Sequence, residues 1–154
     1  MRRLAALVVL AFCPAIALAD GPCAALSGET IFHCQIQGST KALTVCERPD
    51  GAFHYAYGRA NDPDLTLDRT VADLAYRPWN GVGFSYWASL TFENEGYRYE
   101  VWFDAIKDGS QPVTGGVHIY APGVDQAGGR PTAEQVCRTG TVETRLDEIE
   151  DRFE

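Results

Sequence analysis

The sequence predicts an all-β protein: a single antiparallel β-barrel or sandwich, stapled by two disulfides, with a short C-terminal helix. Three observations predict it. Apolar and polar residues alternate along two long consecutive runs, turn-forming residues interrupt the rest of the chain at short intervals, and four cysteines follow an N-terminal export signal. The 154 residues are enough for one such domain with one core.

The first nineteen residues have the three parts of a secretory signal peptide. Arg2 and Arg3 are positively charged, Leu4–Phe12 is an apolar segment too short to span a bilayer, and Ala17-Leu18-Ala19 is a small-x-small cleavage site. We therefore expect a signal peptide over residues 1–19 and a single β domain over residues 20–154, either periplasmic or secreted. A retained membrane anchor is the alternative; after cleavage no membrane association is expected.

The chain is strongly acidic. It has 13 basic and 21 acidic residues, and removal of the signal leaves 11 basic residues, which gives a formal net charge of −10. Such a chain repels phosphate backbones, so nucleic acid is not expected as a partner. The same field attracts a basic protein or a cationic ligand, although acidity also serves solubility alone.

Short strands separated by turn residues fill the first half of the domain. Gly38 marks the first turn, and Pro49-Asp50-Gly51 and Asp62-Pro63-Asp64 mark later ones. The expected strands are Thr30–Ile36, Ala42–Glu47, Ala52–Gly58, Leu65–Leu67 and Val71–Tyr76.

The strongest structural signal is a hairpin within Gly81–Ile106. Apolar residues occupy every even position from 82 to 92 and every odd position from 97 to 105, so each run places its apolar side chains on one face of a strand. Glu93-Asn94-Glu95-Gly96 is expected to form a four-residue loop, which pairs Phe92 with Tyr97. A slip of one residue would turn one apolar set toward solvent.

The opposite face of this hairpin combines two tryptophans with polar side chains. In the expected register Trp87 lies opposite Trp102, and Arg98, Glu100 and Asp104 lie near them. One interpretation is an aromatic binding surface made by these five residues, because exposed apolar surface marks interaction sites. The alternatives are a cross-strand pair that only stabilises the sheet, and a face covered by a loop or by the C-terminal helix.

The last part of the chain changes in character. Gly115–Tyr120 and Glu134–Arg138 are the late strand candidates, and the Gly- and Pro-rich residues 121–132 between them predict an irregular loop. Residues 142–154 predict a short acidic amphipathic helix that docks on the sheet. Its apolar residues at helical spacing are Leu146, Ile149 and Phe153.

Four cysteines remain in the domain: Cys23, Cys34, Cys46 and Cys137. An even number in an exported chain predicts two disulfides; the rival interpretation, a zinc site, lacks a C-x-x-C pair. Alternation places Cys34 and Cys46 on opposite faces of neighbouring strands, which disfavours their pairing. Two connectivities remain, Cys34–Cys137 with Cys23–Cys46 and Cys23–Cys34 with Cys46–Cys137. We favour the first, because it ties the first strand to the last and helps to close a barrel.

The sequence contains no motif that assigns a catalytic residue, a metal or a cofactor. His33, His54 and His118 lie in different strands without partners at metal-ligand spacing, so surface positions are expected for them. The sequence also lacks the nucleophile-elbow, zinc-protease, P-loop and dinucleotide-binding motifs.

Five short motifs carry a resemblance to a known group of proteins. They are Ile31-Phe32-His33-Cys34, Leu43-Thr44-Val45-Cys46, Tyr55-Ala56-Tyr57-Gly58, Gly83-Phe84-Ser85 and Gly96-Tyr97-Arg98-Tyr99. From about Cys23 to Cys137 the chain resembles a family of small exported bacterial proteins of unknown function, which implies a fold and a location.

A fainter similarity rests on Phe32-His33-Cys34 leading to Leu43-Thr44-Val45. These residues are similar to the opening of periplasmic lysozyme inhibitors, which are small β-barrels with a disulfide from an early strand to the C-terminus. The present chain departs from them in its length and its four cysteines, and their inhibitory loop is not identified in Trp79–Ser85.

These features together predict a non-enzymatic exported binding protein, with a basic protein or a small ligand as partner. Two other functions are compatible with the sequence. One is inhibition of a basic envelope hydrolase such as lysozyme, which the acidity of the chain would suit. The other is an enzyme with a composite site that uses His54 or His118.

Overall fold

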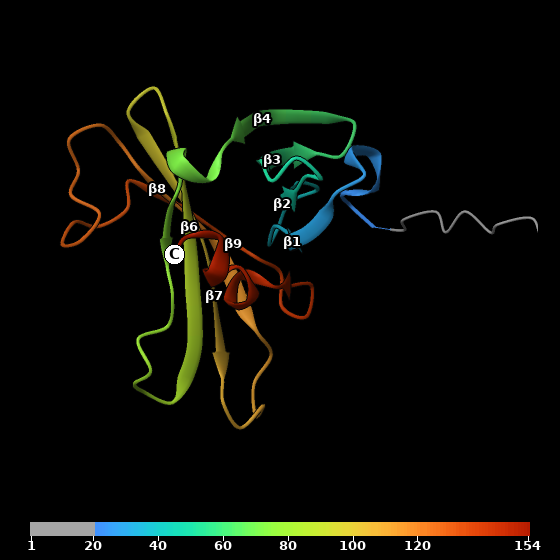
Figure 1. Ribbon diagram of the computed structural model, residues 1–154. Helices are drawn as coiled ribbons and strands as arrows, with labels where there is room; N and C mark the ends of the chain where they lie inside the picture. Colours follow the sequence, from blue (N-terminus) through green and yellow to red (C-terminus); the bar gives the residue numbers. More distant parts are fainter. Residues whose placement is uncertain (1–20) are drawn as a thin grey trace, which may run out of the picture.

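The computed structural model describes residues 21–154, which form two antiparallel sheets of five strands each (Figure 1). The first sheet has the order β10-β1-β2-β3-β4, with β1 Glu29–Gln35, β2 Ala42–Glu47, β3 Phe53–Arg59, β4 Asp62–Arg69 and β10 Glu143–Thr144. The second has the order β5-β6-β7-β8-β9, with β5 Ala75–Arg77, β6 Ser85–Asn94, β7 Tyr97–Ile106, β8 Thr114–Tyr120 and β9 Ala133–Val136. The expected signal peptide, residues 1–19, lies outside the described residues.

The two sheets pack face to face around one apolar core, as the all-β prediction required. Alternation explains the packing, because Leu43 and Val45 of β2 and Leu90 and Phe92 of β6 all turn inward and are buried. Neither sheet closes into a barrel within residues 21–154, so the sandwich is the correct one of the two architectures that the sequence left open.

The disulfides have the favoured one of the two connectivities that strand alternation left open, Cys34–Cys137 with Cys23–Cys46. Cys34 of β1 bonds to Cys137, just beyond β9, where an isolated bridge pairs Cys137 with Ile36. This bond therefore ties the first sheet to the second instead of closing a barrel. Cys23 bonds to Cys46 of β2 and holds the short 3-10 helix η1, Ala24–Leu26, near the outer face of the first sheet.

The β6–β7 hairpin has the predicted faces but a different register. Phe92 pairs with Tyr99 instead of Tyr97, because the turn contains two residues instead of the expected four. Those two residues, Glu95 and Gly96, have φ values of 53° and 79°, the left-handed conformation that two-residue turns need to match the strand twist. The shift by two residues conserves the faces, but the prediction that Trp87 lies opposite Trp102 is wrong: Trp87 pairs with Asp104, and Trp102 with Ser89.

The expected start of the hairpin at Gly81 is also wrong. Residues 78–84 form a loop before β6, so Val82 and Phe84 do not continue the buried stripe and are 72% and 80% exposed. In Figure 1 this loop projects with the β7–β8 turn beyond one end of the second sheet. The ammonium of Lys107 links the two, since it donates to the carbonyl of Gly83 at 2.8 Å.

Two shorter elements also differ from the expectation. In place of a strand over Val71–Tyr76, the 3-10 helix η2, Val71–Asp73, leads into the short strand β5. β4 is longer than the expected Leu65–Leu67 and includes Pro63, which it tolerates because β4 is an edge strand.

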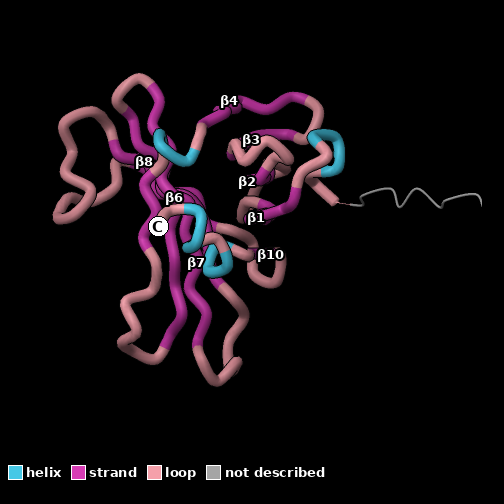
Figure 2. Tube along the Cα trace, viewed as in Figure 1, coloured by secondary structure: helices cyan, strands magenta, loops and turns pink. Residues whose placement is uncertain are grey.

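The C-terminal segment is not one helix over 142–154. It forms strand β10 and two 3-10 helices, η3 Leu146–Glu148 and η4 Glu150–Arg152 (Figure 2). Its apolar residues still dock as expected, because Leu146 and Ile149 are buried in the core and the ring of Phe153 stacks on Tyr76 at 5.0 Å. None of the helices within residues 21–154 is long and apolar enough to cross a membrane.

Removal of the two disulfides should cost unequal amounts of stability. The cysteines are 103 residues apart in Cys34–Cys137 and 23 apart in Cys23–Cys46. In the chain-entropy model, alanine at both positions should lower the free energy of unfolding by about 4–5 kcal/mol for the first pair and about 3–3.5 kcal/mol for the second. Denaturant unfolding of the two double variants measures both losses. A larger loss on removal of Cys23–Cys46 than of Cys34–Cys137 would contradict the role given to the bond between the sheets.

Candidate functional site

The outer face of the second sheet carries a row of polar side chains across four strands. Directly paired residues of neighbouring strands share a face, and Glu100 of β7 pairs with Thr91 of β6 on one side and His118 of β8 on the other. His118 in turn pairs with Glu134 of β9. The register therefore places a carboxylate, an imidazole and a second carboxylate side by side.

Glu100 is the centre of this row, and its side chain is 7% exposed. Its Oε1 accepts hydrogen bonds from Ser89 Oγ at 2.9 Å and Arg77 Nη1 at 3.5 Å. Its Oε2 lies 3.1 Å from the donating Tyr120 Oη and 3.3 Å from His118 Nδ1. A buried carboxylate is expensive unless its oxygens are hydrogen-bonded, and here both are.

Two opposing effects act on the ionisation of Glu100. Burial, the largest single effect, raises its pKa, but hydrogen bonds from Ser89, His118, Tyr120 and Gln126 together outweigh it and lower the pKa below the ordinary value. Burial and the neighbouring Glu100 charge raise the pKa of Tyr120 to about 12. At neutral pH, Tyr120 is therefore a phenol that donates to a carboxylate.

His118 connects this polar cluster to an indole. Its Nε2 lies 3.0 Å from Glu134 Oε1, and its ring stacks on Trp102 at a centroid distance of 5.2 Å and an interplanar angle of 23°. The residue opposite Trp102 on β8 is Gly116, where a Cβ atom would clash with the carbonyl oxygen of Gln135. Glycine therefore lets β9 approach β8 closely and leaves no side chain opposite the indole.

A groove of about 410 Å³ lies over these residues, and we call it the Trp87–Trp102 groove. Its lining includes Arg77, Trp87, Glu100, Trp102, Asp104 and His118. Both indoles are half-buried, and the Arg77 guanidinium lies over the Trp87 ring at 5.8 Å. Asp104 pairs with Trp87 in the register and accepts a hydrogen bond from Ser85 Oγ at 2.8 Å.

Four of the five residues expected to form the binding surface line this groove: Trp87, Trp102, Glu100 and Asp104. The fifth, Arg98, lies on the same face but away from the groove. It donates to the carbonyl of Val124 and lies over the Tyr120 ring, so it holds the 121–132 loop against the sheet. Gln126 of the same loop donates to Thr91 Oγ1 at 3.0 Å, so a loop covers this end of the face.

Sequence reasoning did not include Arg77, Tyr120 and Glu134 in a site, and it named His118 only for a composite enzyme site. The alternation of β8 was a usable signal, because Val117 is buried in the core and His118 must therefore point outward. That signal gives the face of His118 but does not give its neighbour, because the register of β8 against β7 depends on the irregular connection 107–113.

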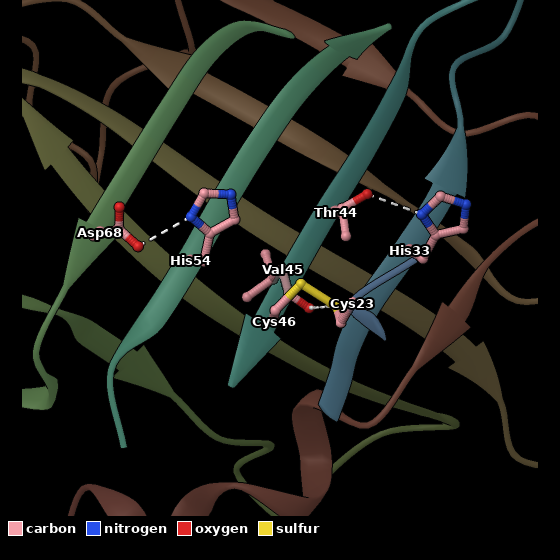
Figure 3. Close-up of a disulfide and its surroundings, with 7 residues drawn as sticks. All are labelled: Cys23, His33, Thr44, Val45, Cys46, His54 and Asp68. Atoms are coloured by element: carbon pink, nitrogen blue, oxygen red, sulfur yellow. Dashed lines mark hydrogen bonds and ion pairs between the residues drawn. A yellow bond between two sulfur atoms is a disulfide. The ribbon is translucent and has the colours of Figure 1, made fainter. Parts of the chain in front are cut away.

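Two other hollows lie outside this groove. The larger, about 780 Å³, lies beside the β6–β7 turn, where the Arg69 guanidinium is held by the carbonyl of Glu93 at 2.7 and 3.1 Å. The other, about 340 Å³, is on the outer face of the first sheet. Figure 3 shows that His33 and His54 lie there on either side of the Cys23–Cys46 disulfide, bonded to Thr44 at 2.9 Å and Asp68 at 3.0 Å.

These histidines are half-buried and face outward. Burial lowers the pKa of His33, against the opposing effect of Glu143, so this ring is neutral at neutral pH. Within residues 21–154 no group of three or more His, Cys, Asp or Glu side chains is arranged to hold a metal ion. The first sheet therefore offers no metal centre in the part of the chain that the structure describes.

Replacement of Glu100 by glutamine should make the protein less stable and less sensitive to acid. Because the folded-state pKa of Glu100 lies below its ordinary value of 4.5, the carboxylate stabilises the fold above pH 4.5, and this contribution is lost as pH falls through the folded-state pKa. Glu100→Gln should lower the free energy of unfolding by about 2 kcal/mol at neutral pH and flatten its decline below pH 4.5.

Denaturant unfolding at a series of pH values measures both effects. Glu93→Gln is the matched control, because this glutamate is exposed at the end of β6. Equal acid sensitivity in the Glu100→Gln variant and the wild type would contradict the role of the buried carboxylate.

Comparison of the chain with known proteins gives no relative from which a function could be inferred. The chain matches no protein-family model, no curated protein and no solved structure. A fold of this class hosts many functions, so function must be inferred from the chemistry of the Trp87–Trp102 groove and its neighbours.

Proposed function

We propose that this chain is an exported, non-enzymatic binding protein, periplasmic or secreted, that holds its ligand in the Trp87–Trp102 groove. The observation that carries the proposal is the pair of half-buried indoles over a groove in an otherwise polar sheet face. Indoles give a large contact area at a small cost in conformational entropy, which suits a binding surface.

The groove is organised before a ligand arrives, which supports binding. Trp102 is stacked on His118, and the ring of Trp87 lies under Arg77. The indole nitrogen of Trp102 is buried and has no hydrogen-bond partner among residues 21–154, so packing and stacking hold this ring. A side chain that is already fixed loses little freedom on binding, and this increases affinity.

The hydrogen bonding of the polar cluster favours binding over catalysis. Both oxygens of Glu100 accept hydrogen bonds, and both ring nitrogens of His118 lie within 3.3 Å of carboxylate oxygens. A general base needs a free lone pair directed at the substrate. In this arrangement Glu100 and His118 hold the groove in shape.

The disulfides support the proposed location. Structural disulfides persist in oxidising compartments such as the periplasm and the extracellular space. Both bonds lie within the folded domain, and all four cysteines are buried.

Trp87→Ala with Trp102→Ala should abolish the recovery of a specific ligand. The wild type, this double variant and Trp79→Ala would each be used to co-purify bound material from bacterial periplasmic extract, with mass spectrometry as the readout. Trp79 is the control, because it is the third tryptophan and packs on Tyr86 outside the groove. We expect the same material with the wild type and Trp79→Ala and none with the double variant, while circular dichroism shows an intact sheet.

Recovery of the same material with the double variant would overturn the groove as the binding site. A second pair, Trp87→Phe with Trp102→Phe, covers the case in which the alanine variant fails to fold. It should weaken recovery without abolishing it, because phenylalanine retains part of the aromatic area.

A second candidate, inhibition of a basic envelope hydrolase, is favoured by the loop at residues 78–84. This loop exposes Val82 and Phe84, yet internal contacts hold it. Trp79 Nε1 donates to the carbonyl of Val82 at 2.9 Å, and Lys107 Nζ lies 4.1 Å from the centre of the Trp79 ring. An ordered loop with exposed apolar side chains on an acidic protein would suit an apolar cleft in a basic enzyme.

The inhibitor candidate predicts that purified protein slows the clearance of a cell-wall suspension by lysozyme. Val82→Ser with Phe84→Ser should raise the inhibitory concentration about tenfold or more, because apolar anchors dominate such contacts. Leu26→Ser is the control, since Leu26 is an exposed apolar residue in η1. No inhibition by a micromolar excess of the wild type would remove this candidate.

A further inference from the structure

The Trp87–Trp102 groove contains a carboxylate without a cationic partner. Asp104 is half-buried, and its carboxylate accepts a hydrogen bond from Ser85 Oγ at 2.8 Å. No Lys, Arg or His between residues 21 and 154 forms an ion pair with it. By contrast, Glu100 is bonded to Arg77 and His118. Asp104 is therefore the charge in the groove that is left for a ligand.

The balance of charge around the groove is negative. Glu100, Asp104 and the adjacent Glu134 supply three carboxylates, and Arg77 supplies one guanidinium. Arg98, which lies over the Tyr120 ring at 5.9 Å, adds a second guanidinium next to the groove, so the balance is −1 when His118 is neutral. An anionic ligand would be repelled, and the net charge of the whole chain, −8, adds to this.

The indoles add to the attraction for a cation. The face of an aromatic ring, and of tryptophan above all, attracts ammonium and guanidinium groups. The fold already uses this contact, because Arg77 lies over Trp87 at 5.8 Å and Lys107 lies over Trp79 at 4.1 Å.

A neutral ligand would fit this chemistry less well. If it covered the groove, it would remove water from Asp104 without supplying a countercharge, and the desolvation of an unpaired carboxylate is unfavourable. A positively charged ligand removes the same water and replaces it with an ion pair. The groove therefore favours a cation over a neutral molecule of equal size.

We propose that the Trp87–Trp102 groove binds an organic ammonium group, with Asp104 as its counterion and the two indoles as its aromatic walls. The proposal rests on the proposed function, since it names the ligand class of the same groove. The ammonium is the chemistry recognised, and it is present both in lysine side chains of a basic protein and in free polyamines.

Isothermal titration calorimetry with three probes tests the proposal: trilysine, spermidine and the neutral saccharide chitotriose. We expect trilysine, spermidine or both to bind the wild type, and the affinity to fall as NaCl rises from about 0.02 to about 0.3 M. Binding of only one of the two distinguishes a peptide source from a polyamine source. Chitotriose should not bind.

Two single substitutions with opposite expected effects make the test specific. Asp104→Asn keeps an acceptor for Ser85 but removes the charge, and it should weaken ammonium binding about fivefold or more. Arg77→Gln removes the competing cation beside Trp87 and should strengthen binding about twofold or more. A variant that merely destabilises the fold would not increase affinity. Asp62→Asn, at an exposed position in β4 of the other sheet, changes the net charge equally and should have no effect.

The outcomes separate the ligand class from the binding site. If chitotriose binds instead and Trp87→Ala with Trp102→Ala abolishes its binding, the ammonium assignment is overturned and the groove stands. Equal weakening by Asp104→Asn and Asp62→Asn would show attraction by bulk charge and overturn the site. If none of the probes binds, the ammonium assignment is overturned, while the co-purification experiment still decides the groove.

Discussion

The burial of Glu100 in the middle of an exposed sheet face is the constraint on which the site depends. An ionised carboxylate shielded from water needs hydrogen-bond donors, and the neighbouring strands supply them. They are Arg77 of β5, Ser89 of β6, and His118 and Tyr120 of β8. A change of register in any of these strands would remove a donor, so the carboxylate fixes the alignment of four strands. The same alignment places Trp102 against His118 and gives the groove its shape.

The two faces of the second sheet therefore have different roles: one packs in the core and the other carries the groove. Its inner face is an ordinary apolar core, which the Cys34–Cys137 bond ties to the first sheet. Its outer face has the polar cluster around Glu100, which the 121–132 loop reaches at Thr91, and the groove that lies over this cluster and the two indoles. The core packs against the inner face of the sheet, and the hydrogen bonds of the polar cluster position the side chains around the groove.

Much of the fold could be predicted from local patterns. The period of two in β6 and β7 gave the inner and outer faces correctly. Parity also argued against a Cys34–Cys46 bond, but the choice between the two remaining disulfide connectivities rested on the expectation that Cys34–Cys137 ties the first strand to the last. The predicted register of the β6–β7 hairpin was wrong by two residues, because Glu95 adopts a left-handed conformation that is uncommon for a residue other than glycine. Val82 and Phe84 continue the alternating pattern, but they lie in the loop that precedes β6, so pattern alone could not show that they are exposed.

The site was predicted in part, for a physical reason. Trp87, Trp102, Glu100 and Asp104 belong to one hairpin, and parity is enough to place them on one face. Arg77 and Glu134 come from β5 and β9, whose pairing depends on connections of irregular length. Cross-strand neighbours across such connections are set by the folded sheet as a whole, so one sequence does not reveal them.

A double-mutant cycle between Glu100 and Tyr120 tests the central claim most directly. The free energy of unfolding would be measured for the wild type, Glu100→Gln, Tyr120→Phe and the double variant. A buried charge-assisted hydrogen bond predicts a coupling energy of about 1.5 kcal/mol or more, whereas the pair of Glu100→Gln with Tyr97→Phe, at an exposed tyrosine, should be additive. Additivity of the Glu100 and Tyr120 substitutions within about 0.5 kcal/mol would contradict the claim that this carboxylate organises the face.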